Sequence, residues 1–244
     1  MKLWAMSDLH LSISGAKPMD VFGPEWHGHA SRIESSWRRL VAPEDVVLVP
    51  GDLSWAMRLE DAGPDLDLIR SLPGRKVILR GNHDYWWKSL SRVRAALGEG
   101  CMVLQNDAAD MGDLVVAGTR GWNLPGGPFY DEERDRPLCE RELERLDMSL
   151  NSAAGLASDG KPVVVMMHFP PSEDGRATGF TERISHSGAR LCVYGHLHGL
   201  GPDFPCDFDL DGVTYLLVSS DRLGFAPLEL DRALWAAAPG KSTL

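Results

Sequence analysis

The chain has 244 residues, with 25 Lys and Arg against 35 Asp and Glu, so its formal net charge is −10. Its hydrophobic content of 43% is that of a folded globular protein, and four cysteines and 25 glycines exclude a disulfide miniprotein and a collagen. The acidic charge and the absence of Lys/Arg clusters argue against nucleic-acid binding, which depends on neutralising many phosphates. We expect a single domain over residues 1–244.

The cysteines and the apolar segments indicate the compartment. The four cysteines are at least 14 residues apart, so no Cys-x-x-Cys pair is available for zinc or redox chemistry. No stretch approaches the roughly 18 apolar residues of a transmembrane helix, and polar residues interrupt the amino terminus before a secretory signal can form. We therefore expect a cytoplasmic protein with reduced thiols and no membrane partner.

Seven short runs rich in β-branched and aliphatic residues recur along the chain, and each is typical of a strand buried on both faces. They are Leu3–Met6, Val46–Val49, Lys76–Leu79, Leu114–Ala117, Val163–Met167, Leu191–Tyr194 and Tyr215–Val218. Between them, amphipathic stripes predict helices over residues 31–41, 66–72, 90–97 and 143–157. Strands that alternate with helices predict right-handed βαβ units, and the whole pattern predicts an α/β layered sandwich.

Two of these helices carry a further signal. A Ser31-x-x-Glu34 capping box predicts the start of the first one. The charged residues of the last one predict a solvated face with ion pairs between successive turns, and no partner is inferred from it. These residues are Glu140, Arg141, Glu142, Glu144 and Arg145.

Five short blocks place a carboxylate, an amide or an imidazole directly after a predicted strand. They are Asp8-Leu9-His10, Gly51-Asp52, Gly81-Asn82-His83-Asp84, His168 and Gly195-His196-Leu197-His198. The functional crevice of an open α/β sheet lies beyond the carboxyl ends of its strands, so these blocks could converge there. Five of the eight histidines fall in the blocks, and oxygen and imidazole ligands without thiolate suit divalent Mn, Fe or Zn. The number of candidate ligands predicts two ions.

The five blocks, taken in this order, resemble the calcineurin-like metallophosphoesterase superfamily from residue 3 to about residue 220. The resemblance implies a four-layer α-β-β-α sandwich of two mixed sheets flanked by helices. The stretches 55–58, 81–87 and 118–122 are similar to those of a bacterial subgroup described only as predicted phosphohydrolases. This label implies hydrolysis of a phosphoester without naming a substrate.

The resemblance also implies a binuclear metal centre. The first ion would be held by Asp8, His10 and His198, the second by Asn82, His168 and His196, and both would be bridged by Asp52. A hydroxide held between the ions would attack phosphorus, and His83 would protonate the departing alkoxide as general acid. Mn is the expected metal, and Fe, Zn or Ni accept nearly the same ligands.

The second block departs from the protein serine/threonine phosphatases of this superfamily. Those read Gly-Asp-x-x-Asp-Arg-Gly, whereas this chain reads Gly51-Asp52-Leu53-Ser54-Trp55-Ala56-Met57. The acid that would pair with the catalytic histidine and the phosphate-binding arginine are both missing, so this activity is not expected. Asp84 is a candidate partner of His83 by adjacency alone.

Three further residues are candidates for contact with the substrate. Arg120 follows a predicted strand and could hold a phosphate or carboxylate, and a surface salt bridge is an equal alternative. Trp55 and Tyr85 could form an aromatic wall with Trp86 and Trp87 for a planar leaving group. Packing in the core is the alternative interpretation of these aromatic residues.

Two more segments have an open interpretation. Ser219 and Asp221 follow a late strand and could support ligand imidazoles by hydrogen bonds, or could simply form a turn. The His-x-His pair of Trp26-His27-Gly28-His29 lies in a Gly/Pro-containing loop rather than at a strand end, so we expect an ordinary loop.

Together these patterns predict a hydrolase of EC 3.1 type that acts on a small phosphodiester or phosphomonoester. The diester is favoured because the sequence shows no pair of arginines to grip a dianionic monoester. A nuclease or nucleotide pyrophosphatase is the alternative enzyme, and the net charge argues against it. A catalytically inactive scaffold with the same fold is the alternative of another class. The physiological substrate and the oligomeric state stay open.

Overall fold

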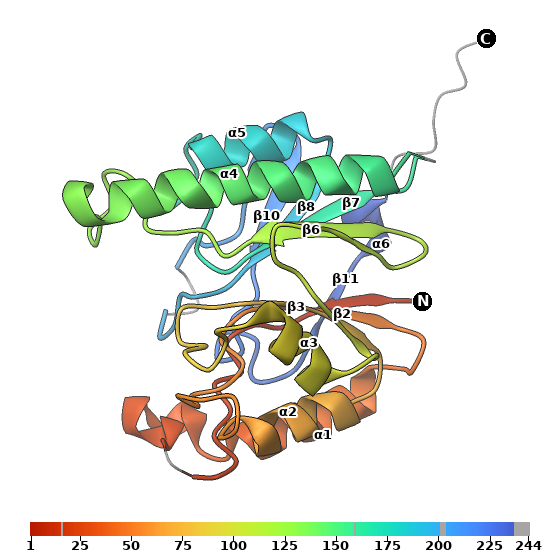
Figure 1. Cartoon of the computed structure of the whole chain (residues 1–244), viewed down its shortest axis with the longest axis vertical. Helices are drawn as coiled ribbons and strands as arrows, with labels where there is room; N and C mark the ends of the chain where they lie inside the picture. The colour runs from red at the N-terminus through yellow and green to blue at the C-terminus, as the bar shows by residue number, and fades with distance from the viewer. Residues whose placement is uncertain (16, 159, 201–203, 237–244) are drawn as a thin grey trace.

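Two β-sheets lie face to face between two layers of helices in the computed structural model, which describes residues 1–15, 17–158, 160–200 and 204–236 (Figure 1). Helices α1 (His29–Leu40), α2 (Gly63–Ser71) and α3 (Leu90–Leu97) cover the outer face of one sheet (Figure 1). Helices α4 (Glu132–Leu156) and α5 (Gly179–His186) cover the outer face of the other (Figure 1). The four-layer α-β-β-α sandwich is therefore confirmed. No helix among the described residues is long and apolar enough to cross a membrane.

The first sheet has five strands, and its central ones are parallel. Their order is β11 (Leu228–Leu230), β1 (Leu3–Ala5), β2 (Val46–Pro50), β3 (Arg75–Leu79) and β4 (Cys101–Val103), with β11 antiparallel to β1. The covering helices are α1 (His29–Leu40), α2 (Gly63–Ser71) and α3 (Leu90–Leu97). The parallel order of β1, β2 and β3 follows from the βαβ units predicted in the first hundred residues.

The second sheet has six strands, and antiparallel strands form both of its edges. Their order is β5 (Ala109–Asp110), β6 (Val115–Thr119), β7 (Val163–Met167), β8 (Leu191–Tyr194), β10 (Val213–Leu217) and β9 (Phe208–Leu210). The covering helices are α4 (Glu132–Leu156) and α5 (Gly179–His186). Two short 3-10 helices, η1 (Met19–Phe22) and η2 (Pro24–Trp26), precede α1, and α6 (Arg232–Trp235) follows β11.

Alternate residues of each central strand belong to different parts of the core. Trp4 and Val47 pack under the first helical layer, whereas Leu3 and Val46 pack between the two sheets. A strand whose two faces are both buried needs apolar residues at every position, which is why the continuous aliphatic runs of the sequence mark these strands.

Two local predictions are wrong. Helix α1 begins at His29, after Gly28, with no side-chain cap, so Ser31 and Glu34 lie inside the helix rather than at its start. The charged segment of α4 is not wholly solvated, because Glu142 is buried at 1% exposure. A buried carboxylate must be paired, and its partners line a pocket described below.

Candidate metal centre

The blocks that follow the strands meet where the carboxyl ends of the two sheets come together. Within the first sheet, the backbone N–H of Asp8 donates to the carbonyl of Gly51 at 3.0 Å. Within the second, the N–H of Gly195 donates to the carbonyl of His168 at 3.1 Å. The imidazole of His168 also reaches across to the first sheet, where its Nδ1 lies 2.9 Å from the carbonyl oxygen of Pro50. Segments far apart in the sequence therefore share one site.

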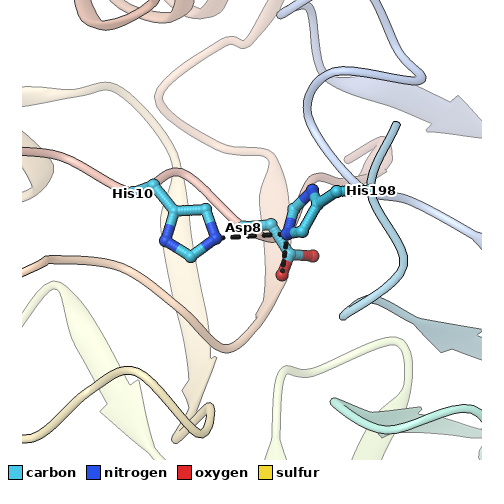
Figure 2. Close-up of side chains that lie close together, drawn as sticks. All are labelled: Asp8, His10 and His198. Carbon is cyan, nitrogen blue, oxygen red and sulfur yellow. Dashed lines mark hydrogen bonds and ion pairs between the residues drawn. The ribbon is translucent and has the colours of Figure 1, made fainter. Parts of the chain in front are cut away.

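One group of ligand atoms gathers around His198. Its Nε2 lies 3.1 Å from the Nε2 of His10 and 3.1 Å from Oδ1 of Asp8 (Figure 2). The two loops that carry these residues come from opposite sheets, and the three side chains point toward one another (Figure 2). Asp8 is fully buried and His10 is 2% exposed.

A second group of ligand atoms gathers around the side-chain amide of Asn82. Its Oδ1 lies 2.6 Å from Nε2 of His168 and 2.9 Å from Nδ1 of His196. His168 is fully buried, and the other two are partly exposed. This group comes from the ends of β3, β7 and β8.

The carboxylate of Asp52 lies between the two groups. Its Oδ2 is 3.7 Å from Nε2 of His10 and 3.5 Å from Nε2 of His168. This buried oxygen has no hydrogen-bond partner among the described residues, whereas Oδ1 accepts a bond from the backbone N–H of His83 at 2.8 Å. A buried, unpartnered carboxylate oxygen is costly unless a cation satisfies it.

Burial and charge hold most of these imidazoles in the neutral form that binds metals. Burial lowers the pKa of His168 to about 3 and that of His196 to about 4. Burial also lowers the pKa of His198, but the carboxylates of Asp8 and Asp221 outweigh it and raise the value to about 10. Burial and the nearby acids raise the pKa of Asp52 well above its ordinary value. Excess negative charge therefore surrounds His198 and Asp52, and divalent cations would neutralise it.

The residues fit two divalent ions. Ligand atoms that share an ion with bonds of about 2.1 Å lie roughly 3 to 3.4 Å apart, and the distances above are close to that spacing. The sets Asp8, His10, His198 and Asp8, Asp52, His168 each bring three possible ligand atoms within 4.8 Å of one another. All these ligand atoms are oxygen or nitrogen, which suits Mn, Fe and Zn alike.

Backbone strain is concentrated at the same place. Among the residues that the structure describes, seven other than glycine have a positive φ, and four of them are candidate ligands. These are Asp8 at 58°, His10 at 43°, Asp52 at 53° and His196 at 75°. Such conformations cost free energy and persist where the surroundings fix them, as they do at functional sites.

Sequence comparison agrees with this geometry. The calcineurin-like phosphoesterase family matches residues 1–200. The chain belongs to this family. The match extends from β1 through His198, so every candidate ligand of the phosphoesterase lies within it. No curated protein matches the sequence.

Solved structures share the fold of this phosphoesterase at low sequence identity. A phosphopantetheinyl hydrolase from Mycobacterium tuberculosis is 18% identical, with a TM-score of 0.57 and 98% of each chain covered. A protein of unknown function from Aquifex aeolicus is 15% identical, with a TM-score of 0.53, and 93% of this chain and 95% of that chain are covered.

The aromatic residues around His83 divide between the site and the core. The ring of Trp55 stacks on His10 with centroids 4.9 Å apart and lies 4.4 Å from the ring of His83. The hydroxyl of Tyr85 lies 3.5 Å from Nδ1 of His83 and is exposed. Trp86 and Trp87 are buried at 1% and 2% exposure. For these two residues the alternative interpretation, packing in the core, is therefore the correct one.

Asp84 does not orient His83. Its buried carboxylate instead accepts backbone N–H groups of the loop that carries Asp52 and of the turn before Asn82. The donors are Asp52 N at 3.0 Å, Leu53 N at 2.9 Å, Ser54 N at 3.3 Å, Gly81 N at 2.8 Å and the indole Nε1 of Trp86 at 3.1 Å. The hypothesis of an Asp84–His83 pair is therefore wrong, and Asp84 fixes the loops on either side of the site.

Residues that follow the last candidate ligand in the sequence also contact the candidate site. The hydroxyl of Ser219 donates to Oδ2 of Asp8 at 3.0 Å, and that of Ser220 donates to the carbonyl oxygen of Asp8 at 2.7 Å. A carboxylate oxygen of Asp221 lies 3.3 Å from Nδ1 of His198, which fixes the orientation of the ring. The predicted contact with an imidazole agrees with the position of Asp221, whereas Ser219 bonds to the carboxylate of Asp8 instead.

His29 fills a supporting position that the sequence did not reveal. It is buried, and its two ring nitrogens lie 3.2 Å from the carbonyl oxygen of Trp26 and 3.1 Å from that of His10. His27 is exposed. The side chain of His29 therefore contacts the backbone of the candidate ligand His10. The His-x-His spacing alone did not predict this contact.

Gly81 is required by a close approach of two loops. A Cβ at this position would lie 2.0 Å from Oδ1 and 2.4 Å from the backbone nitrogen of Asp52. We expect Gly81→Ala to displace Asp52 and to lower metal content and thermal stability together. Gly155→Ala is the matched control, because Gly155 lies exposed in α4 with open space at its Cβ. Elemental analysis and thermal unfolding of both variants test this, and an intact metal content in Gly81→Ala would contradict it.

Proposed function

We propose that this chain is a binuclear metal-dependent phosphoesterase that hydrolyses a small phosphodiester or phosphomonoester, with the diester favoured. The observation that carries the proposal is the unpartnered Oδ2 of Asp52, which lies between two groups of oxygen and nitrogen ligands. A carboxylate in that position can give one oxygen to each of two ions. Membership of the calcineurin-like phosphoesterase family supports the same chemistry.

We assign one metal ion to each of the two groups of ligand atoms. In this proposal Asp8, His10 and His198 hold one ion, Asn82, His168 and His196 hold the other, and Asp52 contacts both. Mn is the first choice, and Fe, Zn or Ni would accept the same atoms. When bound, such ions lower the pKa of a coordinated water and neutralise phosphoryl charge. The chain itself fixes the ligands in place through the contacts of Asp84 and Asp221.

His83 is proposed as the general acid. Its half-buried ring lies 5.6 Å from the ring of His10, beside the first group of ligands. Contact with Trp55 limits how far the His83 ring can turn. In this proposal a proton on one ring nitrogen would pass to the leaving oxygen of a bound ester. Tyr85, at the solvent side of the same ring, would contact the leaving group.

An apolar pocket beside the second group offers room for an organic substituent. It measures about 240 Å³ and is lined by His196 together with Trp122, Leu124 and Phe169. A phosphoester with its phosphorus near His196 could place a small apolar group there. This pocket supports a small organic phosphoester rather than inorganic phosphate alone.

The test is hydrolysis of p-nitrophenyl phosphate and of bis-p-nitrophenyl phosphate, with added Mn and after removal of metal by chelation. We expect turnover that depends on metal and favours the diester. His83→Ala should lower kcat by about 10²- to 10⁴-fold, as for the loss of a general acid, while metal content stays unchanged. His186→Ala, exposed at the end of α5, is the control.

Each other outcome selects a different function. A preference for the monoester would reverse the order of the two substrate classes. Hydrolysis of polynucleotides or of dinucleotide pyrophosphates in place of both esters would favour the nuclease or pyrophosphatase. A protein that binds metal but hydrolyses nothing, with His83→Ala unchanged in every assay, would favour the inactive scaffold.

A further inference from the structure

A pocket lined by four arginines lies next to the metal centre, at the ends of β3 and β6. It measures about 230 Å³, and its charged residues are Arg80, Arg120, Arg141, Arg145 and Glu142. Four guanidinium groups and one carboxylate give it a formal charge of +3, on a chain whose net charge is −10. The sequence showed no pair of arginines, whereas the fold gathers these four in a pocket that none of the proposed metal ligands lines. Residues distant in sequence make up this group, so no local pattern displayed it.

The single carboxylate of the pocket is already satisfied. Glu142 is paired with Arg145 at 2.6 Å and with Arg120 at 3.4 Å, and it also accepts the hydroxyl of Thr119. Among the residues that the structure describes, no ion pair joins Arg80 or Arg141 to a carboxylate. Two guanidinium groups thus face the pocket without a counterion from the described chain.

Two of the arginines that line the pocket also have a side-chain donor atom that is not used. The Nε atoms of Arg80 and Arg120 are buried and have no hydrogen-bond partner among the described residues. Burial lowers the pKa of Arg120, and the neighbouring charges of Arg80 and Arg145 lower it further against the opposing effect of Glu142. Arginine nevertheless stays protonated. Glu142 offsets part of the repulsion among these groups, and an anion in the pocket would offset more of it.

The pocket adjoins the proposed second-ion ligands through the backbone. Arg80 lies two residues before Asn82, and the carbonyl oxygen of Arg120 accepts the backbone N–H of His168 at 3.2 Å. Arg141 and Arg145 are one turn apart on α4, which covers the second sheet (Figure 1). None of the proposed metal ligands lines the pocket, so it is a separate site at the same end of the sheets.

We propose that this four-arginine pocket binds a phosphoryl dianion. Guanidinium groups match the tetrahedral oxygens of phosphate with paired donors, and a dianion neutralises most of the charge that the pocket carries. The dianion can be a second phosphoryl group of the substrate or free inorganic phosphate. Only the first of these sources rests on the proposed function, because anion binding needs no turnover.

Calorimetric titration with inorganic phosphate tests the site. The titration uses the Mn-loaded protein and the protein freed of metal by chelating resin. Arg141→Gln should weaken binding by about ten- to a hundredfold, as for the loss of one hydrogen bond to a charged group. Arg141 makes no ion pair with a described residue, so its loss leaves no buried carboxylate alone. Arg136→Gln, exposed on the same helix and paired with Glu132 and Glu140, should bind as the wild type does.

A pair of substrates identifies the source of the dianion. The first substrate is thymidine monophosphate esterified with p-nitrophenol, which is a phosphodiester. The second is the same compound with an additional phosphate group on the sugar. A tenfold or larger preference in kcat/KM for the analogue, lost in Arg141→Gln and kept in Arg136→Gln, assigns the pocket to the substrate. Equal rates together with phosphate binding assign it to free phosphate.

The inference and the proposed function fail separately. If neither diester is hydrolysed, the proposed function is contradicted for these esters, and the phosphate titration still decides about the pocket. The pocket is not a phosphoryl site if inorganic phosphate does not bind to the metal-free wild type, or binds equally to wild type and Arg141→Gln, and the two diesters are hydrolysed at equal rates or not at all.

Discussion

The Asp52→Asn variant is expected to lose metal-dependent hydrolysis of bis-p-nitrophenyl phosphate by about 10³-fold or more, because a binuclear centre depends on the ligand shared by its ions. An Asn side chain has a single oxygen that can bind a metal, and it carries no charge. It therefore cannot give one oxygen to each of two ions, as a carboxylate can. Elemental analysis should find fewer than two ions bound per chain.

The same substitution should stabilise the chain once metal is removed. Asp52 is buried near the carboxylates of Asp8 and Asp84, which disfavour its charge. A neutral amide removes this repulsion, so the melting temperature of metal-free Asp52→Asn should be above that of the metal-free wild type. The exposed Asp113→Asn serves as the control. If Asp52→Asn keeps full activity and binds two ions, the proposed bridging role of Asp52 is wrong.

Asp84→Asn is expected to destabilise the protein by about 3 to 6 kcal/mol, since each hydrogen bond to a charged group contributes roughly 1.5 to 3 kcal/mol. The carboxylate of Asp84 accepts four backbone N–H groups and one indole N–H. An amide keeps one oxygen and turns its NH₂ group toward N–H donors, so at least two of these bonds are lost. Urea unfolding of the metal-free protein measures the change.

Kinetic measurements distinguish a structural role of Asp84 from a catalytic one. Asp84 lies next to His83 in the sequence, but its carboxylate makes no hydrogen bond to the His83 ring in the described part of the chain. Its loss should therefore lower the stability and the metal affinity of the protein more than it lowers kcat. At saturating Mn and low temperature, Asp84→Asn should recover a larger fraction of wild-type kcat than His83→Ala does. Wild-type stability of Asp84→Asn would show that its hydrogen bonds contribute little.

The central strands and the ligand blocks could be predicted from the sequence for the same physical reason. A parallel strand covered on both faces must be apolar throughout, so it stands out, and its end is marked by the first polar residue. Asp8, Asp52 and His168 each follow such a run closely, and the structure brings them together. The short strands β4, β5, β9 and β11 were not predicted, because two or three residues carry too little pattern.

Contacts made to the backbone could not be predicted. Asp84 is bound by N–H groups, which every residue except proline carries, so no side chain identifies its partners. Likewise the burial of Glu142 depends on where α4 crosses the second sheet, which no periodicity of charged residues specifies. Helix α5 was missed although Thr178 and Thr181 form a genuine capping box at its start.

Strand β1 lies between β2 and β11, so its pairing can be completed only after β11 has been synthesised. Leu3 pairs with Val46 on one side and with Leu230 on the other, and Asp8 depends on the hydroxyls of Ser219 and Ser220. The first strand therefore leaves the ribosome long before the residues that complete its surroundings, and this non-local pairing is slow to form. A nascent chain holds Asp8 without these hydroxyls and without His198. We therefore expect capture of metal at the proposed site to wait until the segment that carries His198, Ser219 and Ser220 has been synthesised.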